Sequence, residues 1–186
     1  FIVGIVERED ALTGAAVREG DVLVGLPSSG LHTNGYTLAR KVLFDTMGYR
    51  VDTRVPELGA TVGEALLVPH RSYLSAVEPL LERRKIRALA HITGGGFQGN
   101  IPRVLPEGLA ARVRKGSWPV PPLFRLIQKG GQVDEDEMLR TFNMGIGMVA
   151  MVGPDDLHEV EHSLERRGET SFVIGSVAKG RGVQFE

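Results

Sequence analysis

The sequence predicts an α+β fold in which a mixed β-sheet is covered by helices. Short apolar runs typical of strands and amphipathic stretches typical of helices follow one another without strict alternation. The 186 residues are enough for a sizeable core, and 42% of them are apolar. The chain contains no internal repeat and no low-complexity linker. We therefore expect residues 1–186 to form a single domain.

Two strands and a helix are predicted in the first quarter of the chain. Residues 1–6 have the apolar run of a buried strand, and because the chain starts inside this run, we expect it to be a piece of a longer protein. Residues 22–26 are apolar on both alternating faces, which predicts a central strand covered on both sides. After a polar loop, residues 36–47 carry apolar side chains at helical spacing and end at Gly48, a predicted C-cap.

A second helix and two further strands are predicted in the middle of the chain. The helix covers residues 72–84, and the spacing of its apolar residues predicts that four of them face inward: Leu74, Val77, Leu80 and Leu81. A short strand over residues 88–92 ends in three glycines. Residues 109–113 have the pattern of an edge strand.

The C-terminal part predicts two helices, then a strand, a helix and a strand. Residues 123–129 form a helix that we expect Gly130 and Gly131 to end. Asp134 and Glu137 have the spacing of a capping box, so the acidic run there predicts a helix start rather than a metal site. The strand, helix and strand that follow are predicted at residues 144–152, 154–168 and 172–177.

Composition excludes several classes of function. With 22 basic and 23 acidic residues, the net charge of −1 supplies no general field for nucleic acid or an anionic membrane. The absence of cysteine excludes disulfide scaffolds, thiol nucleophiles and cysteine-bound metals. No apolar stretch reaches the roughly 20 residues of a membrane helix. We expect a cytoplasmic protein without nucleic-acid or membrane partners.

Two motif matches are discounted. His158 and His162 satisfy the HExxH pattern of zinc sites, but both lie opposite the apolar stripe of their helix and should face solvent, so no metal site is expected. Residues 94–99 formally contain the GxGxxG dinucleotide pattern, yet the acidic residue expected about 20 positions later is missing. The chain also lacks a P-loop.

Two loops share one design that favours anion binding. In residues 28–35 and 91–100, a buried strand leads into a glycine-containing turn with a histidine, a hydroxyl residue and an asparagine. Such turns direct backbone N–H groups at a phosphate or carboxylate, although two tight turns with capping residues would look the same. His32 and His91 are the histidines of these loops and are candidates for proton transfer. Asn143 fits a ligand contact and a turn cap equally well.

Four longer runs resemble one enzyme family, and in this order they are highly specific. They are residues 20–36, 90–97, 100–106 and 140–148, and the last contains Arg-Thr-Phe-Asn-Met-Gly-Ile-Gly-Met. Together they resemble the C-terminal half of the phosphoribosylformylglycinamidine cyclo-ligase, or AIR synthetase, family of purine biosynthesis. The resemblance implies the fold of that C-terminal domain and an ATP-dependent ring closure, which converts formylglycinamidine ribonucleotide to aminoimidazole ribonucleotide, ADP and phosphate.

The resemblance also implies partners and cofactors. In this family the ATP and magnesium motifs lie in the N-terminal half, which supplies most of the contact of a homodimer. That half is absent from this chain, so we expect no cofactor to bind this domain alone and an exposed apolar face where that half docks. The alternative is a non-catalytic module that binds a phosphate ligand or a protein.

Site residues carry over from the family position by position. His32 and His91 become candidates for proton transfer or substrate contact. The substrate pocket, with the ribose phosphate at the triglycine turn, would be lined by Ser29, Asn34, Thr93, Gly94, Gly95 and Gly96, with Asn143 as a third wall. His70 stands where other members often have threonine, so the resemblance gives it no catalytic role.

Overall fold

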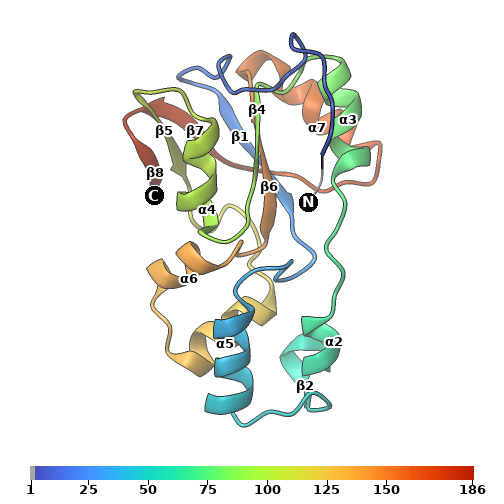
Figure 1. The fold of residues 1–186 in the computed structure, drawn as a ribbon, viewed down its shortest axis with the longest axis vertical. Coiled ribbons are helices and arrows are strands. Elements are labelled where there is room, and N and C mark those ends of the chain that lie inside the picture. Colours follow the sequence, from blue (N-terminus) through green and yellow to red (C-terminus); the bar gives the residue numbers. More distant parts are fainter. Residues whose placement is uncertain (1–2) are drawn as a thin grey trace.

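A six-stranded mixed sheet forms the centre of the fold in the computed structural model, which describes residues 3–186 (Figure 1). The strand order is β4-β6-β1-β7-β5-β8, and every neighbouring pair is antiparallel except β5 and β8, which run parallel. The strands are β1 (Val22–Pro27), β4 (Ala88–His91), β5 (Leu109–Val113), β6 (Ile146–Val152), β7 (Phe172–Lys179) and β8 (Gly182–Phe185). The predicted α+β class with a mixed sheet is confirmed.

Helices cover both faces of this sheet. One face packs against α3 (Leu74–Glu82) and α7 (Leu157–Glu165), and its core includes Val24, Val152, Leu80 and Val160. The other face belongs to a larger core that extends to the remaining helices, drawn in front of and below the sheet in Figure 1. These are α1 (Tyr36–Arg40), α2 (Val62–Leu66), α4 (Gly96–Asn100), α5 (Pro122–Gly131) and α6 (Glu135–Thr141), and a small hairpin of β2 (Arg54–Val55) and β3 (Ala60–Thr61) lies beside α2. Over residues 3–186, no helix combines the length and the apolar character needed to cross a bilayer.

The helix predicted over residues 36–47 is confirmed, but its second half is wound more widely. From residue 41 to residue 46 it is a π-helix, and the N–H of Met47 donates to the carbonyl of Val42, five residues back, at 2.9 Å. Gly48 follows with a φ of +67°, the left-handed conformation that ends a helix most easily at glycine.

Helix α5 ends at Gly131, as predicted, although Gly130 and Gly131 are its last two residues rather than its cap. Gln132 takes the left-handed cap position with a φ of +49°. A Cβ on Gly131 would stand 2.5 Å from Cγ2 of Val42. The two glycines are therefore needed for the close approach of α5 to the helix after the first loop.

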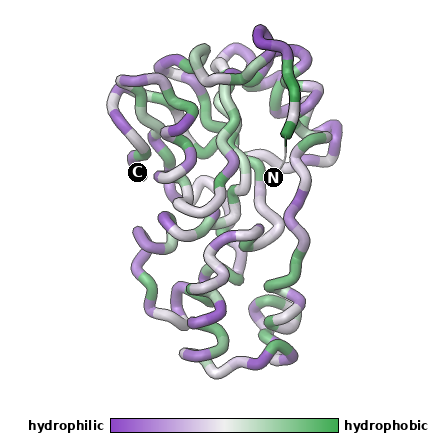
Figure 2. The backbone as a smooth tube through the Cα atoms, in the orientation of Figure 1, coloured by the Kyte–Doolittle hydropathy of each residue, from purple (hydrophilic) through white to green (hydrophobic). Residues whose placement is uncertain are grey.

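Two predicted strands differ from the structure. Residues 1 and 2 of the predicted N-terminal strand lie outside the described residues, and residues 3–6 form no strand. Val3, Ile5 and Val6 are exposed, and Figure 2 shows hydrophobic colouring along the segment next to the N-terminal end. These residues form no strand because an apolar run becomes a strand only when a neighbouring strand pairs with it. Residues 109–113 are not an edge strand, since β8, which was not predicted, pairs along their free side.

Two local predictions about helices were also wrong. Leu74 is 63% exposed because the buried side of α3 is formed by Ala76, Val77 and Leu80, and Leu74 lies to one side of this stripe. The capping box at Asp134 does not form: the helix begins there, but no side-chain hydrogen bond caps it, and Glu137 instead accepts a hydrogen bond from the Thr141 hydroxyl at 2.9 Å.

A buried carboxylate fixes the entry to the central strand. Asp21 is 1% exposed, and its carboxylate accepts from the Arg87 guanidinium at 2.5 Å and from the backbone N–H of Arg18 at 2.9 Å. These contacts join the start of β1 to the segment that leads into β4.

We predict that Asp21→Ala lowers the free energy of unfolding by about 2–4 kcal/mol, because it leaves buried donors without an acceptor. Lys179→Ala removes an exposed ion pair with Glu19 and is the matched control, which should leave the urea midpoint unchanged. Equal midpoints for both variants would contradict this assignment.

Candidate functional site

The sheet topology brings the two predicted loops together. Strand β6 lies between β1 and β4 and is antiparallel to both, so β1 and β4 are parallel to each other and end at the same end of the sheet. Pro27 at the end of β1 pairs with Ile146, and His91 at the end of β4 pairs with Met148. The loops that follow therefore leave side by side, next to the start of β6.

Three histidines meet where these loops begin. His32 is 3% exposed, and its Nε2 accepts from the backbone N–H of Ser29 at 3.0 Å and lies 3.1 Å from the Ser29 hydroxyl. The ring of His70 stacks on that of His32 at 3.8 Å between centroids. Nε2 of His70 lies 3.0 Å from Nε2 of His91. His70, for which no role was predicted, thus connects the two predicted histidines.

The environment keeps two of these imidazoles neutral. Burial, helped by the nearby His70, His91 and Arg71, lowers the pKa of His32 to about 4. Burial, and secondarily His70, also lowers the pKa of His91 from its ordinary value. Both rings are therefore neutral at pH 7 and present lone pairs.

Asn143 holds the first loop against the start of β6. Its Nδ2 donates to the Gly30 carbonyl at 2.9 Å, and its Oδ1 accepts from the Ser28 hydroxyl and the Gly145 N–H, both at 2.8 Å. Its side chain is buried. These are the contacts of a turn cap, and a direct contact between Asn143 and a ligand stays a prediction.

The triglycine turn is held by Asn100 from inside. The Asn100 amide donates to the Gly96 carbonyl at 2.7 Å, and its Oδ1 accepts from the Thr93 hydroxyl at 3.1 Å. Gly95 and Gly96 have φ values of +94° and +56°, and a Cβ on Gly96 would overlap the Leu139 carbonyl oxygen. Glycine is required here by both conformation and space.

Asn34 is the point where the two loops touch. Its Oδ1 lies 3.4 Å from the position that a Cβ on Gly94 would occupy. Its Nδ2 is buried and, among residues 3–186, has no hydrogen-bond partner. A buried donor without a partner is costly, so this amide is available to a ligand that reaches it.

The segment around His70 was missed as part of the site. Arg71 and Tyr73 both donate to the Pro27 carbonyl, at 3.1 and 2.9 Å, and Arg71 also forms an ion pair with Glu169. The segment lies about midway between the two loops in sequence, so neither loop pattern pointed to it. Its only signal was the resemblance of residues 69–73 to a family segment that often reads Pro-Thr-Arg-Ile-Tyr. Because His70 departs from that segment, no role was predicted for it.

Gly147 makes room for this cluster within β6. A Cβ there would stand 2.6 Å from Cε1 of His32 and would overlap the Tyr73 hydroxyl. Glycine at this position of β6 is therefore required by close packing. His158 and His162 are exposed on α7, as predicted.

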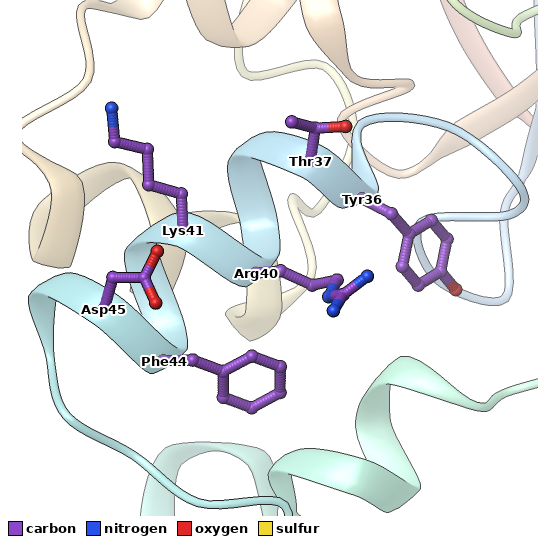
Figure 3. A pocket seen from close by; sticks show the side chains of 6 residues that line it. All are labelled: Tyr36, Thr37, Arg40, Lys41, Phe44 and Asp45. Carbon is purple, nitrogen blue, oxygen red and sulfur yellow. The ribbon is translucent and has the colours of Figure 1, made fainter.

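Two hollows lie beside the loops. One of about 400 Å³ follows the first loop, and Figure 3 shows Tyr36, Arg40 and Phe44 on one side of its helix with Lys41 and Asp45 on the other. The Tyr36 hydroxyl donates to the Leu66 carbonyl at 2.6 Å. The second hollow, of about 260 Å³, is lined by residues that include the predicted His91 and Thr93 together with Asn100 and Arg103. The basic residues of both hollows, Arg40, Lys41 and Arg103, were absent from the predicted site.

We predict that stability falls with acidity because of His32. Its folded pKa of about 4 lies below the ordinary value of 6.5, so the unfolded chain binds the proton first. Neutral His32 contributes about 2–3 kcal/mol to the free energy of unfolding above pH 6.5, and this contribution is lost as the pH falls toward 4. Urea unfolding in EDTA at several pH values measures this contribution. His32→Gln should flatten the pH dependence of the free energy of unfolding, and the control His158→Gln, at an exposed site, should leave it unchanged. Parallel curves for His32→Gln and the unchanged protein would refute this.

Comparison with known proteins places the chain in a family. The model of "AIR synthase related protein, C-terminal domain" matches residues 18–186. The phosphoribosylformylglycinamidine cyclo-ligase of Bifidobacterium animalis subsp. lactis is 51% identical over 178 residues, which cover 95% of this chain and 52% of that protein. The phosphoribosylformylglycinamidine cyclo-ligase of Desulfitobacterium hafniense is 50% identical over 186 residues, which cover 100% of this chain and 54% of that protein. The chain thus spans about half the length of these curated relatives.

Solved structures of low sequence identity share the fold. Thiamine-monophosphate kinase from Stenotrophomonas maltophilia matches with a TM-score of 0.67 and 17% identity, over 97% of this chain and 54% of that chain. The hydrogenase maturation protein HypE of E. coli matches with a TM-score of 0.59 and 18% identity, over 94% of this chain and 49% of that chain. The family model and the relatives of about 50% identity together show that the chain belongs to the AIR synthase related proteins, as their C-terminal domain.

Proposed function

We propose that this chain is the substrate-side half of a phosphoribosylformylglycinamidine cyclo-ligase. The enzyme would use ATP to close the ring of formylglycinamidine ribonucleotide, giving aminoimidazole ribonucleotide, ADP and phosphate. Relatives of about 50% identity that align with nearly all of this chain carry that name, which supports the assignment. We further propose that the complete enzyme is a cytoplasmic homodimer.

One observation carries the placement of the substrate site. The loops after β1 and β4 meet, and at their contact the Asn34 amide is buried without a partner beside Gly94. The neutral imidazoles lie in the same loop pair, and Ser29 is held by His32. This arrangement offers hydrogen-bond donors and lone pairs to a polar, phosphorylated substrate, with the ribose phosphate assigned to the turn of Gly94, Gly95 and Gly96.

The two predicted histidines differ in what they are able to do. His91 is exposed, so its neutral ring is within reach of a substrate and is suited to accept a proton. His32 is buried and its Nε2 is engaged by Ser29, so we assign it the positioning of that loop. Thr93 holds Asn100 and thereby the shape of the second loop.

The chemistry of ring closure then follows. ATP transfers its terminal phosphoryl group to the formamide oxygen, which turns that oxygen into part of a leaving group. The nitrogen that joins the ring attacks the formyl carbon, its proton passes to the ring nitrogen of His91 that does not face His70, and the C–O bond breaks to release phosphate. The protein's part in this step is to hold the two reacting atoms together and to accept the proton.

Within residues 3–186, no cluster of three or more carboxylates is arranged to hold a magnesium ion. Among residues 3–186, the one cluster of three or more groups able to hold a metal ion consists of histidines. Mg²⁺ requires oxygen ligands, and imidazole nitrogen suits other metals. We therefore assign magnesium and the ATP that it accompanies to the other half of the enzyme.

Exposed apolar residues beside the site support a docking surface for that half. Leu67 and Val68, in the segment that leads to His70, are 81% and 40% exposed, and Leu74 after it is 63% exposed. We propose that the N-terminal half covers this segment and so completes the site.

We predict that His91→Asn in the complete enzyme lowers kcat at least about 100-fold, because it removes the proton acceptor. His32→Asn should lower activity as well, through the loss of the Ser29 contact. His162→Asn on α7 is the control and should retain full turnover. Steady-state kinetics, with circular dichroism to verify folding, measures these effects. Near-normal turnover of both site variants would contradict the roles assigned to these two histidines.

A further inference from the structure

The histidine cluster has a second use beyond the proposed catalysis. We propose that His32, His70 and His91 form a binding site for a divalent transition-metal ion of the Zn²⁺, Co²⁺ or Ni²⁺ class. Each ring offers one nitrogen, and the three nitrogens all lie within 4.8 Å of one another. They come from three separate segments: the loop after β1, the segment before α3, and the end of β4.

The pair formed by His70 and His91 already has nearly the spacing of two ligands on one ion. Their Nε2 atoms are 3.0 Å apart. Two imidazole nitrogens bound tetrahedrally to Zn²⁺, each about 2.0–2.1 Å from it, stand about 3.3 Å apart. A shift of a few tenths of an ångström would therefore let both nitrogens bind one ion.

Hydrogen bonding fixes which nitrogen of His70 is free. Its Nδ1 lies 2.8 Å from the Arg71 carbonyl oxygen, which only accepts, so Nδ1 carries the proton. Nε2 of the neutral ring is then a lone pair directed at Nε2 of His91. Two facing ring nitrogens need a proton or a cation between them. A backbone carbonyl on the opposite nitrogen is the partner that metal-bound histidines usually have.

His32 is the third ligand and comes from the buried side. Its Nε2 accepts from the Ser29 N–H, so in the metal-free protein Nδ1 carries the ring proton, and Nδ1 is buried and, within residues 3–186, has no hydrogen-bond partner. An ion bound at Nδ1 displaces this proton, and the Ser29 contact has to open as the ring changes tautomer. Because the rings of His32 and His70 are stacked, one of them must turn for both to reach the same ion. His70 and His91 are both exposed, so the two rings are able to move together and keep the spacing of their Nε2 atoms.

The charge around the cluster permits a cation. The nearest cationic side chain is Arg71, which is paired with Glu169, and its guanidinium also donates to the Pro27 carbonyl. Neutral imidazole favours Zn²⁺, Co²⁺ and Ni²⁺ over Mg²⁺ or Ca²⁺, and three protein ligands leave a coordination position for water or a substrate oxygen.

Titration of the EDTA-treated complete protein with Co²⁺ tests the site, with Zn²⁺ as competitor. We expect one equivalent of Co²⁺ to give visible absorption bands of a nitrogen-bound ion and Zn²⁺ to displace it. His70→Thr should weaken binding at least about 100-fold, as expected for the loss of a ligand. The control is the double variant His158→Ala/His162→Ala, which removes the exposed histidine pair of α7 and should bind like the unchanged protein.

Three results would overturn the proposal: no saturable binding, equal affinity in the His70→Thr variant, or loss of binding in the α7 double variant. Because His70 is exposed, His70→Thr should fold, and its melting temperature in EDTA verifies this. In the unchanged protein Zn²⁺ should raise the melting temperature, and in His70→Thr it should not.

A further readout rests on the proposed function. An ion bound to His91 lowers the basicity of that ring, so Zn²⁺ should inhibit ring closure more strongly in the unchanged enzyme than in His70→Thr. The binding titration needs no activity, so a failure of the metal site and a failure of the cyclo-ligase assignment give different results.

Discussion

The antiparallel pairing of β6 with both β1 and β4 is the constraint on which the site depends. It makes two strands that are more than 60 residues apart in sequence end at the same place, beside the first residues of β6. The loops that follow are thereby held against each other by the sheet itself. Asn143, just before β6, adds hydrogen bonds to the first loop, and Gly147 within β6 leaves the space that His32 fills.

The segment from Pro69 to Tyr73 secures this arrangement from the outside. Arg71 and Tyr73 bind the carbonyl of Pro27, the last residue of β1, and thereby hold His70 over the buried His32. The result is a row of three imidazoles that runs from the interior to the surface. A buried ring beside exposed rings is consistent with the two roles proposed for this cluster, which are to shape a loop and to exchange a proton or an ion with solvent.

Much of this structure was predictable where the local sequence determines the outcome. The central strand, the helix over residues 36–47 and the two glycine-rich loops follow from apolar spacing and turn residues, and His32 and His91 follow from their place in those loops. The short parallel strand β8 and the exposed course of residues 3–6 depend on whether a distant strand is available for pairing. His70 was missed for the same reason, because its neighbours come from loops far away in the sequence.

Hydrogen–deuterium exchange of the complete enzyme with and without formylglycinamidine ribonucleotide tests the central claim most directly. If the paired loops are the substrate site, peptides that cover residues 28–35 and 91–100 gain protection together, with one dissociation constant, and α7 does not change. Protection of only one loop, or protection centred on the hollow of Arg40 and Phe44, would contradict the account.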